Sequence, residues 1–358
     1  MQFKEGKVNS LKYTEKYYKV IDAEIYALAS QIHEYKGQQN LYIEANKDAL
    51  TELLEIAKIQ STEASNEIEG IITTEDRIKK LVIIKTTMPK TRSEEEIAGY
   101  RDVLNIVHES YQFIPVSPST ILQFHRDLYK FNSANTGGEY KEADNVISDV
   151  LPDGAKRIRF KPVVSYLVEG AIEDICLNYN DALNEENIDP LIVIPMFILD
   201  FLCIHPFRDG NGRMSRLLTL LLLYQSGFIV GKYISLEKLI AEHKEEYYDT
   251  LQASSVDWHE NKNTYKPFIK YMLMMIIAAY KDFSDRVELI TNPEISKPDR
   301  VAKIIENTLG EISKAEVMKQ CPDISQTTVQ RSLNSLLKEG KIIKTKAGKY
   351  TRYIWNRE

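Results

Sequence analysis

Hydrophobic residues recur at intervals of three and four along most of this 358-residue chain. The pattern is clearest between Asn46 and Ile68, where it is carried by Leu50, Leu53, Leu54, Ile56, Ala57 and Ile59. This period is that of an amphipathic α-helix and not of a strand. The same period predicts further helices over residues 94–111, 119–130, 163–178, 190–204, 212–225, 236–254 and 266–283. The chain is therefore predicted to be mainly α-helical.

Helix boundaries are indicated by local capping signals. Thr74 and Glu75 are expected to begin a helix shortly after Gly70. Ser93 and Glu96 have the spacing of a capping box, which predicts that the next helix begins at Glu94.

One internal segment departs from the helical period. The turn residues Pro152, Asp153 and Gly154 separate two β-prone runs, Asn145–Val150 and Arg157–Phe160. We expect a β-hairpin here, inside an otherwise helical domain.

A linker with two prolines, Asn292–Pro298, precedes a different pattern. Three short helices are predicted after it, followed by two strand-like runs: Asp299–Asn307, Ser313–Gln320, Ser325–Glu339, Lys341–Lys344 and Tyr350–Trp355. Three helices followed by a two-stranded ribbon is typical of a winged helix-turn-helix. The predicted domains are an N-terminal helical region at 1–90, a core at 91–290 and the winged helix at 299–358.

Composition excludes several classes. The net charge of −6 argues against a polyanion-binding surface over the whole chain, and the cysteines Cys176, Cys203 and Cys321 form no CxxC pair that would suggest zinc or a disulfide framework. No apolar leader is recognisable, and the longest apolar runs, Ile192–Ile204 and Leu217–Tyr224, are too short to span a bilayer. We expect a cytoplasmic protein.

The segment from His205 to Arg216, HPFRDGNGRMSR, lies between two predicted apolar helices. It contains several residues that could bind phosphate or take part in catalysis. Gly210 and Gly212 let backbone N–H groups converge where the next helix offers its positive dipole end, which makes an anion cradle. Arg213 and Arg216 add donors that suit phosphates.

Two further groups complete the motif. Asp209 is a hard oxygen ligand suited to Mg²⁺ between phosphates, and His205 is a titratable group able to take a proton from a hydroxyl. A base, a carboxylate and an anion cradle within twelve residues indicate phosphoryl-group chemistry.

At these residues the chain resembles the Fic family, whose signature HPFx(D/E)GN(G/K)RxxR matches at every position. The resemblance implies a Fic helical-bundle core with a β-hairpin flap, ATP as substrate and Mg²⁺ or Mn²⁺ as cofactor. It implies transfer of AMP to a Ser, Thr or Tyr hydroxyl of a target protein or of the chain itself. Gly212 favours AMP transfer, because a kinase-like relative has Lys at that position.

The resemblance also implies roles for individual residues. His205 would be the general base and Asp209 the metal ligand, with Asn211 orienting the phosphates. Arg216 would hold the γ-phosphate. The remaining implied ATP contacts are Gly210, Gly212, Arg213, Met214 and Ser215.

An inhibitory element is implied upstream. Ser65–Gly70 fits the family pattern (S/T)xxxE(G/N), in which Ser65 and Glu69 share one helix face. A carboxylate at Glu69 would pair with Arg216 and take the arginine away from the γ-phosphate. In some relatives the same glutamate also serves to remove AMP, and the sequence leaves this open.

Substrate contacts are less specific in sequence. The hairpin resembles the family flap, whose edge would bind a target segment by strand addition. Tyr248, and after it Tyr247, is expected to contact the adenine, because a tyrosine offers a stacking face and a hydroxyl; a core role explains both equally well.

The C-terminal module suggests a second kind of partner. Its third helix would expose Gln326, Thr327, Gln330, Arg331 and Asn334, and its wing would add Lys344, Lys346, Lys349 and Arg352. Such a face suits DNA, although many winged helices mediate protein contacts or dimerisation. Two alternatives to AMP transfer therefore stay open: a DNA-binding regulator whose Fic domain senses nucleotide, and a Fic enzyme that transfers another phosphate-linked group.

Overall fold

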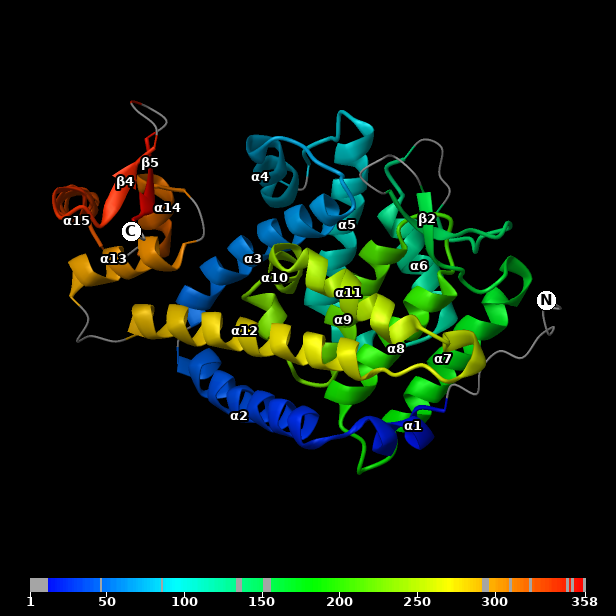
Figure 1. The fold of residues 1–358 in the computed structure, drawn as a ribbon. Helices are drawn as coiled ribbons and strands as arrows, with labels where there is room; N and C mark the ends of the chain where they lie inside the picture. Colours follow the sequence, from blue (N-terminus) through cyan, green and yellow to red (C-terminus); the bar gives the residue numbers. More distant parts are fainter. Residues whose placement is uncertain are drawn as a thin grey trace. The chain divides into compact units, whose positions relative to one another are not determined.

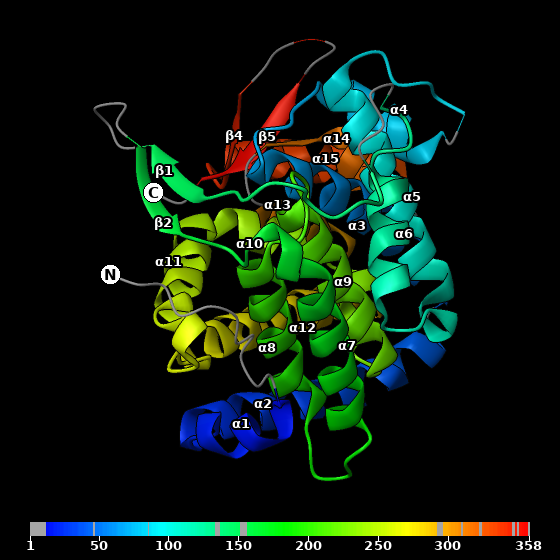
Figure 2. The ribbon, with the colours of Figure 1, turned by 90° about the vertical axis from the view of Figure 1, so that its right-hand side faces the viewer.

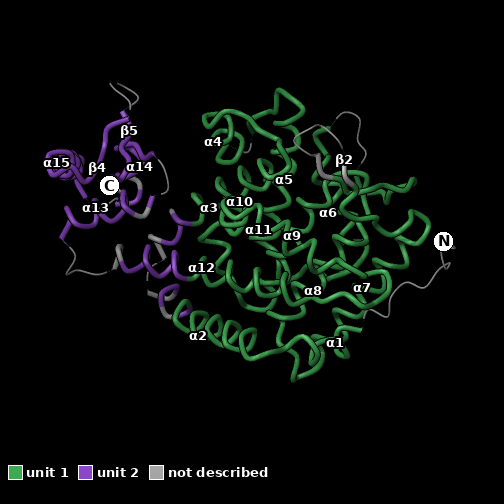
Figure 3. The backbone as a smooth tube through the Cα atoms, in the orientation of Figure 1, with its two compact units in different colours: residues 1–39, 54–280 green, residues 40–53, 281–358 purple. Residues whose placement is uncertain are grey.

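We analysed a computed structural model of the chain. The structure describes residues 12–45, 47–84, 86–132, 137–150, 156–291, 296–308, 311–321, 324–345, 348 and 351–356. Two compact units are present: residues 1–39 with 54–280, and residues 40–53 with 281–358 (Figure 3).

The first unit is built around two consecutive apolar helices, α8 (Pro190–Ile204) and α9 (Asn211–Gln225), which pack against each other (Figure 1). α7 (Val168–Leu183) packs on α8, and α5 (Arg92–Ser110) packs on α9. Almost every residue of α8 and α9 is buried, as expected for helices that are apolar all round. The loop between α8 and α9 is therefore held by two rigid core helices, and this loop carries the predicted chemical motif.

Further helices surround this core. They are α1 (Tyr13–Val20), α2 (Ala23–Ala45), α3 (Lys47–Ile68), α4 (Glu75–Ile83), α6 (Pro118–Leu128), α10 (Leu236–Glu242), α11 (Lys244–Ser255) and α12 (Lys266–Thr291). Three of them, α2, α3 and α12, also contribute an end to the second unit. Short 3₁₀ turns lie at Tyr111–Phe113, Ser165–Leu167, Val230–Lys232 and Trp258–Glu260. The prediction of a mainly α-helical protein is confirmed.

A buried carboxylate ties distant elements to α8. Asp200 is completely buried and accepts hydrogen bonds from Tyr13, Trp258 and Tyr265, at 3.0, 2.6 and 2.9 Å. Burial raises its pKa. These bonds anchor α1 and the segment after α11 to the core helix that leads into the motif.

The predicted hairpin is present. β1 (Ile147–Val150) pairs antiparallel with β2 (Lys156–Phe160), and the pair projects beside α11 (Figure 2). The predicted turn at Pro152–Gly154 lies outside the described residues.

Two helix predictions were wrong in detail. The N-cap of α5 is Thr91 and not Ser93, because the Thr91 hydroxyl accepts a hydrogen bond from the Glu94 N–H. The Glu96 carboxylate pairs with Arg213 instead of closing a capping box. The single helix expected over residues 236–254 is two helices, α10 and α11, separated at His243. Periodicity alone did not show this break because both halves keep the same apolar face.

The C-terminal part of the second unit has its own core. Its elements are α13 (Lys297–Asn307), β3 (Ile312–Ser313), α14 (Lys314–Gln320), α15 (Gln326–Lys338), β4 (Ile342–Lys344) and β5 (Arg352–Trp355). Buried apolar side chains from all six pack together, among them Val301, Val317, Leu333 and Tyr353. The elements follow the order α13-β3-α14-α15-β4-β5, in which the three predicted helices precede the two predicted strands.

Its sheet differs from the two-stranded ribbon that we predicted. β3 adds to β5, which gives an antiparallel sheet of order β3-β5-β4. The sequence predicts a helix from Ser313 and no strand at Ile312–Ser313. Ser313 does cap α14, in a complete capping box with Glu316. Of the predicted linker, residues 292–295 lie outside the described residues, and Lys297 and Pro298 belong to α13.

Within the residues that the structure describes, none of the helices has the length and apolar character needed to cross a bilayer.

Candidate active site

The motif forms the loop between α8 and α9, with both of its ends in left-handed backbone. His205 has φ 51°, a conformation that is costly for a residue with a side chain and is concentrated at functional sites. Gly210 has φ 82°, and a Cβ there would also crowd the Tyr129 hydroxyl at 3.0 Å. Glycine is therefore required at position 210 for the loop to enter α9.

The His205 imidazole lies in a largely apolar setting. Burial, with a contribution from the Lys141 ammonium, lowers the pKa of His205 to about 4. The side chain is consequently neutral at pH 7, the state in which it can accept a proton. Lys141 is itself buried and donates to the Asn145 side chain and to the Ile204 carbonyl at the end of α8, at 2.8 and 3.3 Å.

A cavity of about 200 Å³ lies next to His205. Its walls come from the end of α3, the hairpin, α8, α9 and α11. The lining residues are Glu69, Ile147, Arg159, Phe160, Leu199, Leu202, Cys203, His205, Gly212, Arg216, Tyr247, Tyr248, Leu251, Gln252 and Ser255. Five predicted site residues, His205, Gly212, Arg216, Glu69 and Tyr248, are thus brought together, although three different parts of the sequence supply them.

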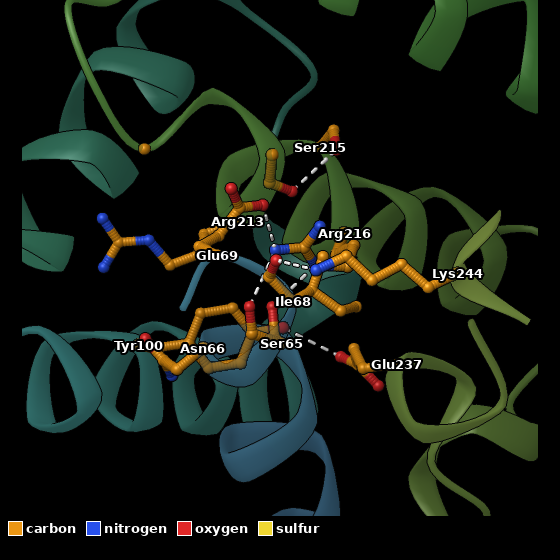
Figure 4. A network of polar contacts seen from close by, with 12 residues as sticks. Ser65, Asn66, Ile68, Glu69, Tyr100, Arg213, Ser215, Arg216, Glu237 and Lys244 are labelled. Atoms are coloured by element: carbon orange, nitrogen blue, oxygen red, sulfur yellow. Dashed lines mark hydrogen bonds and ion pairs between the residues drawn. The ribbon is translucent and has the colours of Figure 1, made fainter. Parts of the chain in front are cut away.

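On its polar side, the cavity is blocked by residues at the C-terminal end of α3, which bind Arg216. Arg216, which is 3% exposed, donates through Nη2 to Oε1 of Glu69 at 2.8 Å and through Nε to the Ser65 hydroxyl at 2.8 Å (Figure 4). Its Nη2 also donates to the Ser65 carbonyl at 2.8 Å. The Glu69 carboxylate lies directly over Gly212, where even one additional methyl group would collide with it.

A buried network supports this arrangement from below. The Tyr100 hydroxyl donates to Glu237 at 2.9 Å, and the Ser61 hydroxyl donates to the same carboxylate at 2.8 Å. Burial raises the pKa of Glu237. At the end of α3, the Lys244 ammonium donates to the Ile68 carbonyl at 2.7 Å and so satisfies the C-terminal end of the helix that carries Glu69.

Four of the predicted ATP contacts do not line the cavity: Asn211, Arg213, Met214 and Ser215. Arg213, 1% exposed, pairs with Glu96 at 2.8 Å and donates to the Tyr129 hydroxyl at 2.8 Å, so its guanidinium does not line the cavity. Met214 is fully buried. The Ser215 hydroxyl donates to the Gly212 carbonyl within α9.

Asn211 braces the loop itself. Its side chain accepts the Phe207 N–H at 3.0 Å and donates to the Phe207 carbonyl at 2.8 Å. Side-chain contacts of Asn211, Arg213, Met214 and Ser215 with phosphate therefore stay predictions, and in this structure these residues shape the loop and α9.

Asp209 is exposed on the outer side of the same loop, and its carboxylate accepts the Gly210 N–H at 2.7 Å. Among the described residues, no group of three or more His, Cys, Asp and Glu side chains is arranged to hold a metal alone. A single carboxylate beside a phosphate cradle nevertheless fits Mg²⁺, which commonly binds one or two carboxylates, substrate phosphates and water.

His125 is a supporting residue that the sequence analysis missed. Its ring stacks on Phe207, with centroids 3.6 Å apart and planes 4° from parallel. Nδ1 accepts the Gly138 N–H at 2.9 Å, so the proton is on Nε2, which donates to the Asp209 carbonyl at 3.1 Å. Burial lowers the pKa of His125 to about 4 and keeps it neutral. A histidine 80 residues before the motif gave no local signal of this role.

Comparison with known proteins agrees with this site. The model of the Fic/DOC family matches residues 115–223, which include the whole motif. A probable protein adenylyltransferase from Aquifex aeolicus is 27% identical over 254 residues, covering 65% of this chain and 73% of that protein. Protein adenylyltransferase fic-1 from Caenorhabditis elegans is 31% identical over 141 residues, which are 36% of this chain and 24% of that protein.

Solved structures share the fold. A Fic family protein from Desulfovibrio desulfuricans G20 aligns over 94% of this chain and 97% of its own, with a TM-score of 0.60 and 20% identity. Fic-1 from C. elegans aligns over 72% of this chain and 70% of its own, with a TM-score of 0.55 and 22% identity. With the motif and the family match in agreement, residues 115–223 of this chain form a Fic/DOC domain, and the fold is that of solved Fic family proteins.

Proposed function

We propose that this protein is an auto-inhibited protein adenylyltransferase, which transfers AMP from ATP to a Ser, Thr or Tyr hydroxyl of a target protein or of the chain itself. The observation that carries the proposal is a single cavity lined by a neutral His205, the Gly212 cradle and Arg216. The Glu69 carboxylate occupies the same cradle.

The transfer needs one base and one anion site. His205 accepts the proton of the attacking hydroxyl, whose oxygen forms the new bond to the α-phosphorus of ATP. The bond from that phosphorus to the bridging oxygen breaks, and pyrophosphate leaves with the electron pair. Backbone N–H groups at the start of α9 and the Arg216 guanidinium stabilise the negative charge of the phosphates.

Asp209 is the residue that would hold a divalent cation. A bound Mg²⁺ would neutralise negative charge on the phosphates. The contribution of the chain is to fix the loop backbone at Asp209, through His125 and the Tyr129 side chain beside Gly210.

The apolar end of the cavity suits the nucleoside. Tyr248 from α11 faces Arg159 of the hairpin, with the guanidinium 5.1 Å from the ring centroid. Tyr247 is buried beneath it. We assign Tyr248 to the base, and the β1–β2 hairpin to the target segment, which would add to it as a further strand.

AMP transfer fits this cavity better than phosphate transfer. Gly212 leaves the cradle open to phosphate at the point where a longer side chain would fill it. If the phosphates bind at α9 and Arg216 and the base at Tyr248, the α-phosphate would lie between them, in the cavity that His205 also lines.

The test uses ATP labelled on either the α- or the γ-phosphate, Mg²⁺, and two variants, Glu69→Gly and Glu69→Gly with His205→Ala. We expect α-label on protein with Glu69→Gly and a loss of at least about a hundredfold with the second variant, in keeping with general-base contributions. Protein label from the γ-phosphate would instead mean phosphate transfer. Nucleotide binding by Glu69→Gly without label on itself or on proteins of a cell extract would contradict the proposal.

A further inference from the structure

Positive charge is concentrated at the C-terminal end of this acidic chain. Residues 297–358 carry 13 Lys and Arg against 7 Asp and Glu, whereas residues 1–296 carry 33 against 45. Within the module, residues 297–323 are balanced, with five of each sign. The whole excess lies in residues 324–358, with 8 basic and 2 acidic residues, and a segregation this strong indicates a polyanionic partner for that segment.

The helix of this basic segment, α15, has two distinct faces. Val329, Leu333 and Leu336 are buried in the core of the module. The opposite face is exposed and polar, and the 13-residue helix contains no carboxylate. Its exposed members are Gln326, Thr327, Arg331 and Asn334, and Gln330 lies half-buried among them.

The amide side chains on this face are already ordered. The Gln330 amide donates to the Asn334 side chain at 3.3 Å, and the Lys314 ammonium of α14 donates to the Gln330 carbonyl oxygen at 3.1 Å. Amide side chains pair with adenine edges and a guanidinium pairs with guanine edges in the major groove of DNA. Gln330, Asn334 and Arg331 therefore form a row of groups suited to reading base pairs.

The surroundings of α15 supply contacts for a sugar-phosphate backbone. Lys344 is exposed on β4. Two of the predicted wing lysines, Lys346 and Lys349, lie outside the described residues. They count only toward the positive charge of residues 324–358. A protein-binding face would be expected to have aromatic or apolar anchors at its centre, and the exposed face of α15 has none.

We propose that the C-terminal module binds duplex DNA, with α15 in the major groove and Lys344 against the phosphates. This activity is separate from AMP transfer, and it uses residues that the cavity does not. Because contacts of Lys and Arg with phosphates release counterions from the DNA, binding is expected to weaken as the salt concentration rises.

The experiment uses the full-length chain and a fluorescent random-sequence duplex, followed by anisotropy at about 50 and 200 mM salt. Wild type should bind saturably at the lower salt. Arg331→Glu should bind at least about tenfold more weakly. The matched control is Lys303→Glu, which makes the same change of charge at an exposed position of α13 and should leave affinity within about twofold.

Selection from a random duplex library supplies the second readout. The wild-type chain should enrich a motif that contains adenine and guanine, and Gln330→Ala should lose preference at one position while still binding. The proposal would be overturned by an absence of binding, by equal losses in Arg331→Glu and Lys303→Glu, or by tighter binding to RNA of the same length. Far-ultraviolet circular dichroism and melting of each variant ensure that any loss is not due to unfolding.

Discussion

The Glu69 carboxylate accepts a hydrogen bond of 2.8 Å from Nη2 of Arg216 while it covers Gly212 at the start of α9. One side chain therefore occupies both Arg216 and the N-terminus of α9, the two groups that would bind the triphosphate under the proposed function. Inhibition of this kind would require no movement of the motif, since the motif is already formed around a carboxylate in place of a phosphate.

Ser65→Ala should weaken the inhibitory contact without removing it. The variant loses the hydroxyl that accepts from Nε of buried Arg216, whereas the bonds to the Ser65 carbonyl and to Glu69 remain. We expect the free energy of unfolding to fall by about 1.5–3 kcal/mol, the range for hydrogen bonds to charged groups. AMP transfer should rise, but less than in Glu69→Gly. Denaturant titration and α-label transfer measure the two effects, and unchanged transfer with lowered stability would show that Ser65 is only structural.

Lys244→Gln should raise basal transfer through the end of α3. The lysine satisfies the Ile68 carbonyl, one residue before Glu69, so its loss loosens the backbone that positions the carboxylate. Lys238→Gln is the matched control. Lys238 lies on the neighbouring helix α10 and pairs only loosely with Glu242 of that same helix, at 3.9 Å. Equal transfer by both variants would contradict a role for Lys244 in inhibition.

The part of this site that was predictable from sequence is the part whose residues are neighbours in the chain. The loop His205–Arg216 and the pair Ser65 and Glu69 follow local patterns with local reasons. Glu237, Tyr100 and His125 are different, because their roles depend on contacts with residues 84 to 176 positions away or on burial that no periodicity describes. Likewise, nothing near Arg213 in the sequence showed that Glu96 would pair with it.

His125→Phe should reduce transfer while the fold is kept. Phenylalanine preserves the stacking on Phe207 but loses the bonds to the Gly138 N–H and the Asp209 carbonyl. In the Glu69→Gly background we expect the rate of AMP transfer to decrease about tenfold, which corresponds to an activation free energy higher by about 1.4 kcal/mol. The concentration of Mg²⁺ that gives half-maximal transfer should increase too. A wild-type rate and Mg²⁺ dependence would show that His125 does not position Asp209.

His108 predicts a specific pH dependence of stability. Burial, with smaller contributions from Lys58 and Lys232, lowers its pKa to about 3. The unfolded chain binds a proton at this residue below about pH 6.5 and the folded chain does not, so stability is lost as pH falls from 6.5 towards 3. In His108→Phe the decrease between pH 6 and 4 should be smaller by up to about 1.4 kcal/mol per pH unit. Parallel curves for the two proteins would contradict the assignment.

The most direct test of the central claim compares AMP transfer by wild type, Glu69→Gly and Glu67→Gly, with α-labelled ATP and otherwise identical conditions. Both substitutions place a glycine near the end of α3, but Glu67 does not line the cavity. If the Glu69 carboxylate blocks the phosphate site, Glu69→Gly should transfer AMP at least about tenfold faster than wild type, and Glu67→Gly should stay near the wild-type rate. Equal activation by both variants, or none by Glu69→Gly, would contradict the account.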